Sequence, residues 1–443
     1  PDLLCVFRYR RLPFGCVIIK GLFCGPFHAC GQGRDFLVGL SWRRAGRLME
    51  IKAVYEKMLP RFRELFGEGE PTLYFAPGRV NLIGEHTDYN GGHVLPCAIS
   101  LGIWALAVRR EGNRVRVGSM NFDDRPPTET GRSGIELRGE WGWANYPLGM
   151  LSTLEVHRYP IPSGLDILFW GELPVGAGLS SSAALEVLTA CVVNDLFGLR
   201  IDRLNMAIMG QETENRFIGT QCGIMDQFAV SMGRKGCAVL LNCAALTHLY
   251  VLLYSGGYQI VIADTDRRQA SGREDYNLRC RQCEAACEAI RRVRPIRTLC
   301  ELSVEDFNRL ESEIPDPVNR RRARHAVTEN QRTLDAARAL SLADLRTFGL
   351  LMRASHLSLR DDYEVTCPEL DALAELAWRQ PGVIGARMTG AGFGGCTVNV
   401  VERHLVSRFI RDVGAGYELQ MGCAPRFYVA DAADGAAKVR LPK

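Results

Sequence analysis

A glycine- and serine-rich turn that runs directly into a helix constrains this 443-residue chain more than any other feature. The turn is Gly176-Ala177-Gly178-Leu179-Ser180-Ser181-Ser182, and apolar residues recur at helical spacing over 182–197 until Gly198 ends the pattern. Glycines let backbone N–H groups turn inward, and a helix N-terminus adds further N–H donors. The pattern is consistent with a phosphate site, but a tight strand-to-helix turn with a serine N-cap explains it equally well. It is not a Walker A loop, because no lysine follows the second glycine.

The rest of the chain alternates short strands and helices without a regular strand–helix–strand repeat. Apolar runs predict strands at 73–76, 94–99, 102–109, 115–117 and 165–169, with β structure across 238–263. Helical patterns cover 202–215, 273–294 and 341–359. This order predicts a mixed α+β fold, and the chain length suggests two or three domains.

Charge is unevenly distributed along the chain. Residues 1–48 have a net charge of +6, whereas the whole chain has a net charge of +4. Residues 49–443 therefore have a net charge of −2. Such a body has no electrostatic reason to bind nucleic acid, and no apolar run approaches the ~18 residues of a membrane span. The dense Arg321-Arg322-Ala323-Arg324-His325 run is expected to form a solvated helix face rather than a polyanion site.

Two further features of composition bear on the protein's location. Residues 1–48 are basic and show no sustained period, so we expect a disordered extension, with the native protein beginning at Met49. Many of the sixteen cysteines lie in apolar surroundings, as in Ala190-Cys191-Val192, which is typical of buried thiols in the reducing cytoplasm. Cys280, Cys283 and Cys287 have helical spacing, but no histidine or fourth cysteine completes a zinc-like pattern.

A second motif, residues 78–92, crowds Arg79, Glu85, His86 and Asp88 into a turn between two apolar strands. Carboxylates and an imidazole can satisfy the several hydroxyl groups of a sugar inside a pocket. A polar surface turn is the alternative. Because the flanking strands should be buried, the motif favours a binding site.

Two more segments carry candidate chemistry. In Gly223-Ile224-Met225-Asp226-Gln227 a single carboxylate stands among apolar residues, twelve positions after Glu214. Phosphoryl transfer to an alcohol needs a carboxylate that positions or deprotonates the hydroxyl, although Asp226 could instead be a helix N-cap. Segment 390–395 contains four glycines, so its backbone must approach something closely, either a phosphate or the first glycine loop.

Taken together, these segments resemble the GHMP kinase superfamily and, within it, the galactokinases. Residues 78–92 are similar to the galactokinase signature, 173–184 to the superfamily's phosphate loop and 387–396 to its C-terminal glycine motif. The resemblance implies a two-lobed α+β fold, with an N-terminal domain at 49–255, a C-terminal domain at 256–443 and the active site between them. It also implies Mg²⁺-dependent transfer of the γ-phosphate of ATP to the anomeric hydroxyl of α-D-galactose, the first step of galactose catabolism. We expect a monomer, although the sequence does not determine the oligomeric state.

The resemblance further assigns roles to individual residues. Asp226 would be the catalytic carboxylate, with Arg79 beside it. The remaining assignments are sugar binding by Glu85, His86, Thr87, Asp88, Gly223 and Tyr276; ATP binding by Gly176, Ala177, Gly178, Leu179, Ser180, Ser181, Ser182, Ser119, Trp143 and Tyr146; and metal binding by Ser182 and Glu214.

Two departures from the family pattern and two alternative functions stand beside these assignments. Residues 1–48 have no counterpart, and Ala184 stands where family members often have serine. One alternative is phosphorylation of a related sugar such as N-acetylgalactosamine or arabinose. The other is a catalytically silent relative that binds sugar and ATP as a sensor.

Overall fold

The computed structural model describes residues 33–174, 176–253, 257–267 and 272–442. The chain divides into two compact units, Pro1–Ile51 and Lys52–Lys443. Helix α1 (Gly33–Phe66) begins within the segment that we expected to be disordered. Arginine and leucine, which favour helices, are frequent over 33–48, so the expectation is wrong for these residues, while 1–32 lie outside the described part of the chain.

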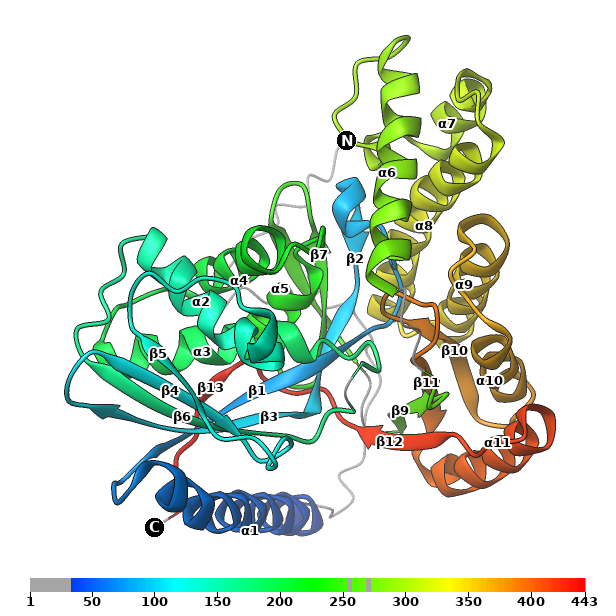
Figure 1. The fold of residues 1–443 in the computed structure, drawn as a ribbon. Helices are drawn as coiled ribbons and strands as arrows, with labels where there is room; N and C mark the ends of the chain where they lie inside the picture. Colours follow the sequence, from blue (N-terminus) through cyan, green and yellow to red (C-terminus); the bar gives the residue numbers. More distant parts are fainter. Residues whose placement is uncertain (1–32, 175, 254–256, 268–271, 443) are drawn as a thin grey trace, which may run out of the picture. The chain divides into compact units, whose positions relative to one another are not determined.

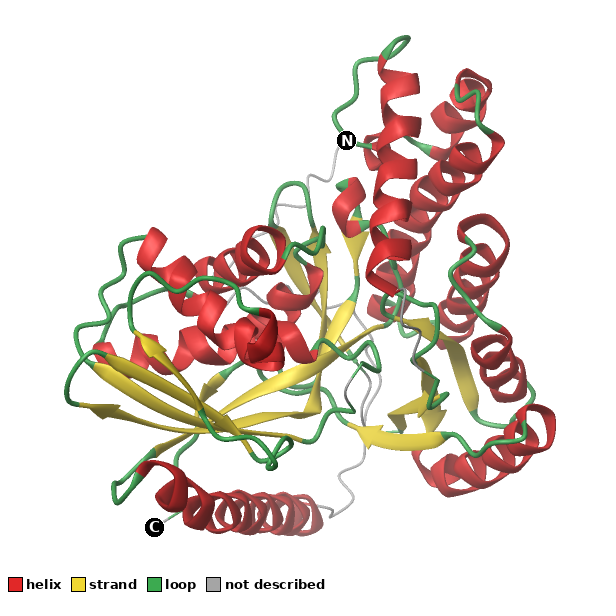
Figure 2. Cartoon of the chain, in the orientation of Figure 1, coloured by secondary structure: helices red, strands yellow, loops and turns green. Residues whose placement is uncertain are grey.

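A six-stranded sheet forms the first layer of the second unit (Figures 1 and 2). Its strands, in spatial order, are β13 (Ala437–Lys438), β1 (Thr72–Asn81), β3 (Pro96–Arg110), β6 (Gly164–Gly171), β4 (Arg114–Ser119) and β5 (Thr128–Gly131). All neighbours are antiparallel except β4 and β6. Strand β13, near the end of the chain, therefore pairs with β1, the strand that leads into the signature turn.

Helices cover one face of this sheet and residues 52–66 of α1 lie on the other (Figure 1). The covering helices are α2 (Asn145–Val156), α3 (Ser181–Phe197), α4 (Arg203–Glu212) and α5 (Met225–Met232). As the sequence predicts, Leu188 and Val192 of α3 are fully buried, and Gly198 ends the helix in the left-handed conformation with φ 65°. Asp202 caps α4 by accepting a hydrogen bond from the backbone N–H of Asn205.

Two smaller sheets and a set of helices complete the unit. One sheet contains β10 (Val383–Thr389), β11 (Cys396–Glu402), β9 (Tyr258–Asp264) and β12 (Arg426–Ala430), and the other contains β2 (His93–Val94), β7 (Cys237–Asn242) and β8 (Thr247–Leu252). The remaining α-helices are α6 (Gly272–Arg291), α7 (Val304–Leu310), α8 (Pro317–Ser341), α9 (Leu345–Ser358), α10 (Pro368–Trp378) and α11 (Val406–Met421). Short 3₁₀ or π turns are η1 (Asp88–Asn90), η2 (Gly139–Ala144), η3 (Thr213–Ile218), η4 (Leu299–Glu301), η5 (Glu311–Glu313), η6 (Leu359–Tyr363) and η7 (Arg403–Leu405).

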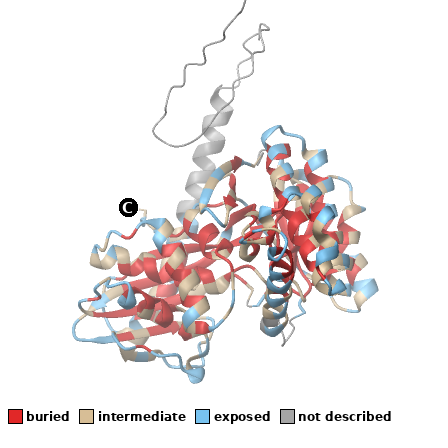
Figure 3. Cartoon of the chain, turned by 90° about the horizontal axis from the view of Figure 1, so that it is seen from above, coloured by how far each residue is buried: buried red, intermediate tan, exposed pale blue. Residues whose placement is uncertain are grey.

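Burial follows these layers: Figure 3 shows buried residues along the sheets and on the helix faces that pack against them. Cys283 and Cys287 lie in a buried apolar cluster, as expected of structural thiols. Among the described residues, no helix combines the length and apolar character needed to span a bilayer. The domain boundary expected at 255–256 falls in a segment outside the described residues.

The arginine-rich run on α8 differs from its prediction as a solvated face. Arg322 is only 2% exposed and His325 is fully buried. Arg322 donates to Glu364 Oε2 at 2.6 Å, and His325 Nε2 donates to the backbone oxygen of Glu85 at 3.1 Å. These side chains therefore hold turn η6 and the signature turn in place, a role that depends on contacts more than 40 residues away in sequence and so left no local signal.

Candidate active site

Eight of the predicted site residues line one polar pocket. It is lined by Arg79, Glu85, His86, Asp88, Glu214, Gly223, Asp226 and Tyr276, together with Thr220, Cys222, Met225, Gly390 and Ala391. These come from β1, the signature turn, η3, α5, α6 and the C-terminal glycine loop, so distant parts of the sequence contribute to a single cavity.

Arg79 and Asp226 form the central ion pair of this pocket. Arg79 Nε and Nη2 donate to the two carboxylate oxygens of Asp226 at 2.8 Å each. The arginine side chain is 4% exposed and the aspartate 30%, so the carboxylate is the partner that faces the cavity. Asp226 lies at the second position of α5, after Ile224 at the N-cap position, so the interpretation of Asp226 as a helix N-cap is wrong. A bidentate arginine fixes the plane of a carboxylate as well as its charge.

The first glycine loop is tied directly to this pair. The backbone N–H of Arg79 donates to the Leu179 oxygen at 3.2 Å, and Arg79 Nη1 donates to the Gly178 oxygen. The hydroxyl of Ser180 donates to Asp226 Oδ2 at 2.6 Å instead of capping α3. Gly176, Gly178 and Ser180 all have positive φ, between 62° and 74°. The alternative of a serine-capped turn is therefore wrong, and the α3 N-terminus keeps its N–H groups for another acceptor.

The second glycine cluster packs on the first. A Cβ at Gly390 would lie 2.8 Å from the Gly178 oxygen, and one at Gly395 would lie 3.0 Å from the Ala177 oxygen. Both glycines also have positive φ, at 88° and 84°. The sequence left a phosphate and the first glycine loop as possible partners of this cluster, and the structure shows contact with the first glycine loop. Glycine is needed at these positions because a side chain would keep the two backbones from approaching this closely.

Asp88 and Gly223 are mutually dependent. A Cβ at Gly223 would lie 2.0 Å from Asp88 Oδ2, so any side chain at 223 would displace the carboxylate. Burial, followed by the nearby Asp226 and Glu85 carboxylates, raises the pKa of Asp88 to about 7. An acid that resists ionisation is well suited to meet hydroxyl groups, which can both donate and accept.

Glu85 and His86 are already engaged within the protein. Glu85 Oε1 accepts from the Gly390 N–H at 2.6 Å, while Oε2 contacts Asn81 Nδ2 and lies 3.5 Å from Arg387. His86 Nε2 lies 3.1 Å from the Ala391 oxygen. Burial raises the pKa of Glu85, although the positive charges of Arg387 and Arg79 act to lower it. Both side chains therefore form the pocket wall and join the signature turn to the C-terminal glycine loop.

Thr87, Ser119 and Trp143 are among the predicted residues that lie apart from the wall of the polar pocket. Thr87 is fully buried, with its hydroxyl 2.8 Å from the Gly84 oxygen and 2.7 Å from the His93 oxygen, so it holds the turn. Ser119 and Trp143 line a separate pocket with Phe122, Arg125 and Trp141. Phe122 and Trp143 stack with ring centroids 6.1 Å apart and an angle of 9° between their planes. They form a flat aromatic surface suited to stacking against a nucleobase.

Several site residues were missed by sequence reasoning. Cys222 and Ala391 line the polar pocket, and Asn81 and the fully buried Arg387 contact Glu85. Arg387 and Ala391 lie in or beside the glycine cluster already noted, so the cluster itself was the available signal. Asn81 lay inside the signature but gave no separate indication of its partner.

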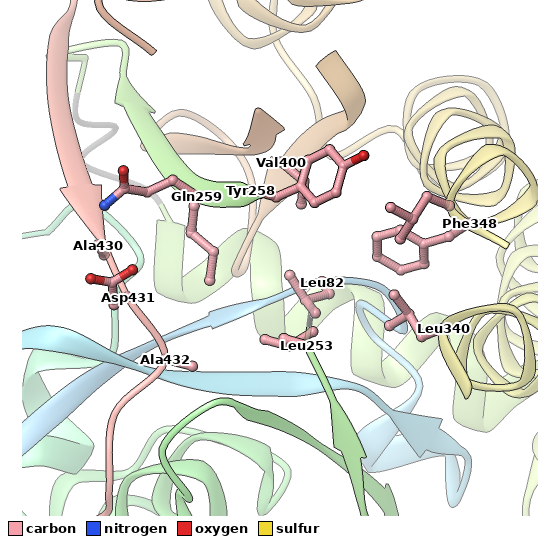
Figure 4. Close-up of a pocket in the computed structure, with 12 residues that line it drawn as sticks. Leu82, Leu253, Tyr258, Gln259, Leu340, Phe348, Val400, Ala430, Asp431 and Ala432 are labelled. Atoms are coloured by element: carbon pink, nitrogen blue, oxygen red, sulfur yellow. The ribbon is translucent and has the colours of Figure 1, made fainter. Parts of the chain in front are cut away.

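Another pocket, between β1, β9 and α9, is apolar. Figure 4 shows Leu82, Leu253, Leu340 and Phe348 directed into it, with Gln259 and Asp431 toward one side. It brings together no pair of charged groups suited to phosphoryl transfer. The polar pocket around Asp226 is therefore the candidate active site.

Comparison with known proteins identifies the family. Residues 60–109 match the family model described as galactokinase galactose-binding signature, 145–234 match GHMP kinases N terminal domain, and 336–419 match GHMP kinases C terminal. A galactokinase of Clostridium beijerinckii is 50% identical over 378 residues, which cover 85% of this chain and 97% of the relative. The chain belongs to the galactokinase family.

Solved structures agree with this assignment. The crystal structure of Lactococcus lactis galactokinase complexed with galactose has a TM-score of 0.84 at 43% identity and covers 88% of this chain and 100% of that one. Methanococcus jannaschii mevalonate kinase, at 17% identity and a TM-score of 0.58, shares the fold. The predicted α+β GHMP kinase fold is confirmed, and the chain is an ATP-dependent kinase of the galactokinase family.

Proposed function

We propose that this chain transfers the γ-phosphoryl group of ATP to the anomeric hydroxyl of galactose and releases galactose 1-phosphate and ADP. The observation that carries the proposal is the junction of Arg79, Asp226 and Ser180. One carboxylate is held between the phosphate loop and a polar pocket. Phosphoryl transfer requires this placement, because the acceptor hydroxyl must stand in line with the terminal phosphate.

Asp226 orients the anomeric hydroxyl and takes its proton as the phosphoryl group moves. Its two oxygens are fixed by Arg79, and its exposed fraction of 30% faces the cavity. Arg79 also supplies a fixed positive charge beside the phosphate loop, where negative charge accumulates in the transition state. Arg79 therefore both orients the Asp226 carboxylate and stabilises the phosphoryl group during transfer.

The sugar occupies the pocket between Asp88, Gly223 and Tyr276. Asp88 offers a carboxyl group with a pKa raised to about 7, and the Tyr276 ring stands 5.6 Å from that of His86. Glu85 and His86 shape the wall and stay engaged with the glycine loop. Thr87, predicted as a sugar contact, supports the turn from behind. The relative from Lactococcus lactis is described as complexed with galactose, which supports the choice of sugar.

The triphosphate lies along Gly176–Ser182, with the base in the pocket of Ser119, Trp143 and Phe122. Ser182 and Glu214 would hold Mg²⁺. Ser182 and Glu186 lie one helical turn apart on the same side of α3, and after burial the Glu214 carboxylate contributes to the raised pKa of Glu186. A hydroxyl and a carboxylate are hard oxygen ligands, and Mg²⁺ bound to nucleotide phosphates needs few from the protein. The ion supplies charge neutralisation for the phosphates.

The test is release of ADP from ATP and Mg²⁺ with galactose, N-acetylgalactosamine or arabinose. We expect turnover with galactose, and loss of turnover in Asp226→Asn, which preserves size and removes the negative charge. Equal or faster turnover of another sugar would refute the galactose assignment. Binding of galactose and ATP without turnover of any sugar would favour the sensor function instead.

A further inference from the structure

The donor and acceptor roles of the His86 ring follow from its partners. His86 adopts a left-handed φ of 63°, and its backbone oxygen accepts from Asn90 Nδ2 at 2.7 Å, which holds the turn. Its Nε2 faces the Ala391 carbonyl, which can only accept, so Nε2 carries the proton. Burial lowers the pKa of His86 to about 3, so the ring is neutral and Nδ1 must be an acceptor.

The rest of a hydrogen-bonded chain is then determined. Tyr89 donates its hydroxyl proton to His86 Nδ1 at 2.9 Å. Because a phenol has one proton, the Tyr89 oxygen must accept from Tyr363 at 2.6 Å. The Tyr363 oxygen in turn accepts from the Cys283 thiol at 3.1 Å. Burial raises the pKa of both tyrosines well above the usual value, so both phenols keep their protons.

Tyr363 is itself rigidly held. Its ring lies between those of His86 and His325, with centroid distances of 4.8 and 4.5 Å. Arg279 Nε donates to its backbone oxygen at 2.8 Å. Two residues later, the Val365 oxygen accepts from the Phe393 N–H at 2.7 Å. The turn that carries Tyr363 therefore also fixes the glycine loop that contains Ala391.

We propose that Tyr363 is a positioning residue for sugar binding, which acts through Tyr89 to fix the tautomer and ring orientation of His86. His86 then holds the Ala391 carbonyl, and both residues line the pocket. Tyr363 itself does not line that pocket, and 274 residues separate it from Tyr89 in sequence. The effect on galactose rests on the proposed function, whereas the hydrogen-bonded chain does not.

Phenylalanine substitutions test the chain kinetically. Tyr89→Phe and Tyr363→Phe each remove one hydroxyl, and each should raise the KM for galactose about tenfold, the cost of leaving a buried acceptor unsatisfied. The KM for ATP should stay unchanged. Because the two hydroxyls act in series, the double variant should be no worse than Tyr89→Phe. Tyr74→Phe is the matched control. Tyr74, on β1, is fully buried and donates its hydroxyl proton to Asp195 of α3 at 2.7 Å, so it takes no part in the His86 chain.

A spectroscopic measurement separates this inference from the proposed function. In protein with ¹⁵N-labelled histidine, long-range ¹H–¹⁵N spectra should show His86 protonated at Nε2 with a hydrogen-bonded Nδ1, assigned by comparison with His86→Gln. Tyr89→Phe and Tyr363→Phe should shift the Nδ1 signal, and Tyr74→Phe should not. Multiplicative loss in the double variant, or an unchanged Nδ1 signal in both single variants, would overturn the proposal even in a fully active enzyme.

Discussion

Replacement of Gly223 by alanine is expected to remove most galactose phosphorylation while the fold survives. The added Cβ would lie 2.0 Å from Asp88 Oδ2, and an ordinary contact begins near 3.4 Å, so the carboxylate must retreat by about 1.4 Å. Asp88 has room to do so, because it also lines a neighbouring pocket beside Ile208 and Gln211. A displacement of ~1 Å at a substrate-positioning group costs about 100-fold in rate.

The expected loss is therefore about 100-fold in kcat/KM for galactose, equivalent to about 2.7 kcal/mol. The measurement is steady-state ADP release over a range of galactose concentrations, with circular dichroism and thermal unfolding to confirm the fold. Gly69→Ala is the matched control, because nothing lies within 4 Å of a Cβ there. Activity of Gly223→Ala within threefold of the control would refute the reasoning, since the collision with Asp88 would then have no functional effect.

Two further predictions concern the charged groups of the pocket. Arg79→Lys should lower kcat by about 10²- to 10³-fold in the same assay, since a lysine cannot bridge both oxygens of Asp226 and the Gly178 carbonyl. Arg116→Lys is its control, because Arg116 makes a similar bidentate pair with Asp166 at 2.7 Å, and equal losses in the two variants would contradict a catalytic role for Arg79. Asp88→Asn should become increasingly more heat-stable than the native protein as pH rises from 5 to 8. The raised pKa of about 7 means that the stability contributed by Asp88 is present below pH ~4 and is lost as pH rises through 7. A difference in Tm that stays constant across this range would show that Asp88 ionises normally.

The sequence predicted the components of the site better than their contacts. The glycine loop, the signature turn and Asp226 each carried a local chemical signature. The signature turn and Asp226 line one pocket, and the glycine loop contacts Asp226 through Ser180, because β1, α3 and α5 pack together. The cap at Asp202 and the helix end at Gly198 were also readable, because both depend on neighbouring backbone.

Contacts over long sequence distances could not be predicted. The Ser180 hydroxyl was expected to cap α3 or bind nucleotide, but it donates to Asp226, 46 residues away. His86 bonds to Ala391, 305 residues away, and Arg322 is buried by a turn that the local pattern of charges does not reveal. The side-chain direction of Thr87 likewise follows from the backbone of the turn, which residue type alone does not determine.

The most direct test of phosphoryl transfer to the anomeric hydroxyl compares galactose with 1-deoxygalactose, which lacks only that hydroxyl. With ATP and Mg²⁺, the account predicts rapid ADP release with galactose and none with 1-deoxygalactose, which should still bind the pocket and compete with galactose. Phosphorylation of 1-deoxygalactose would contradict the central claim, because the phosphoryl group would then be reaching a hydroxyl other than the one that Asp226 is proposed to face.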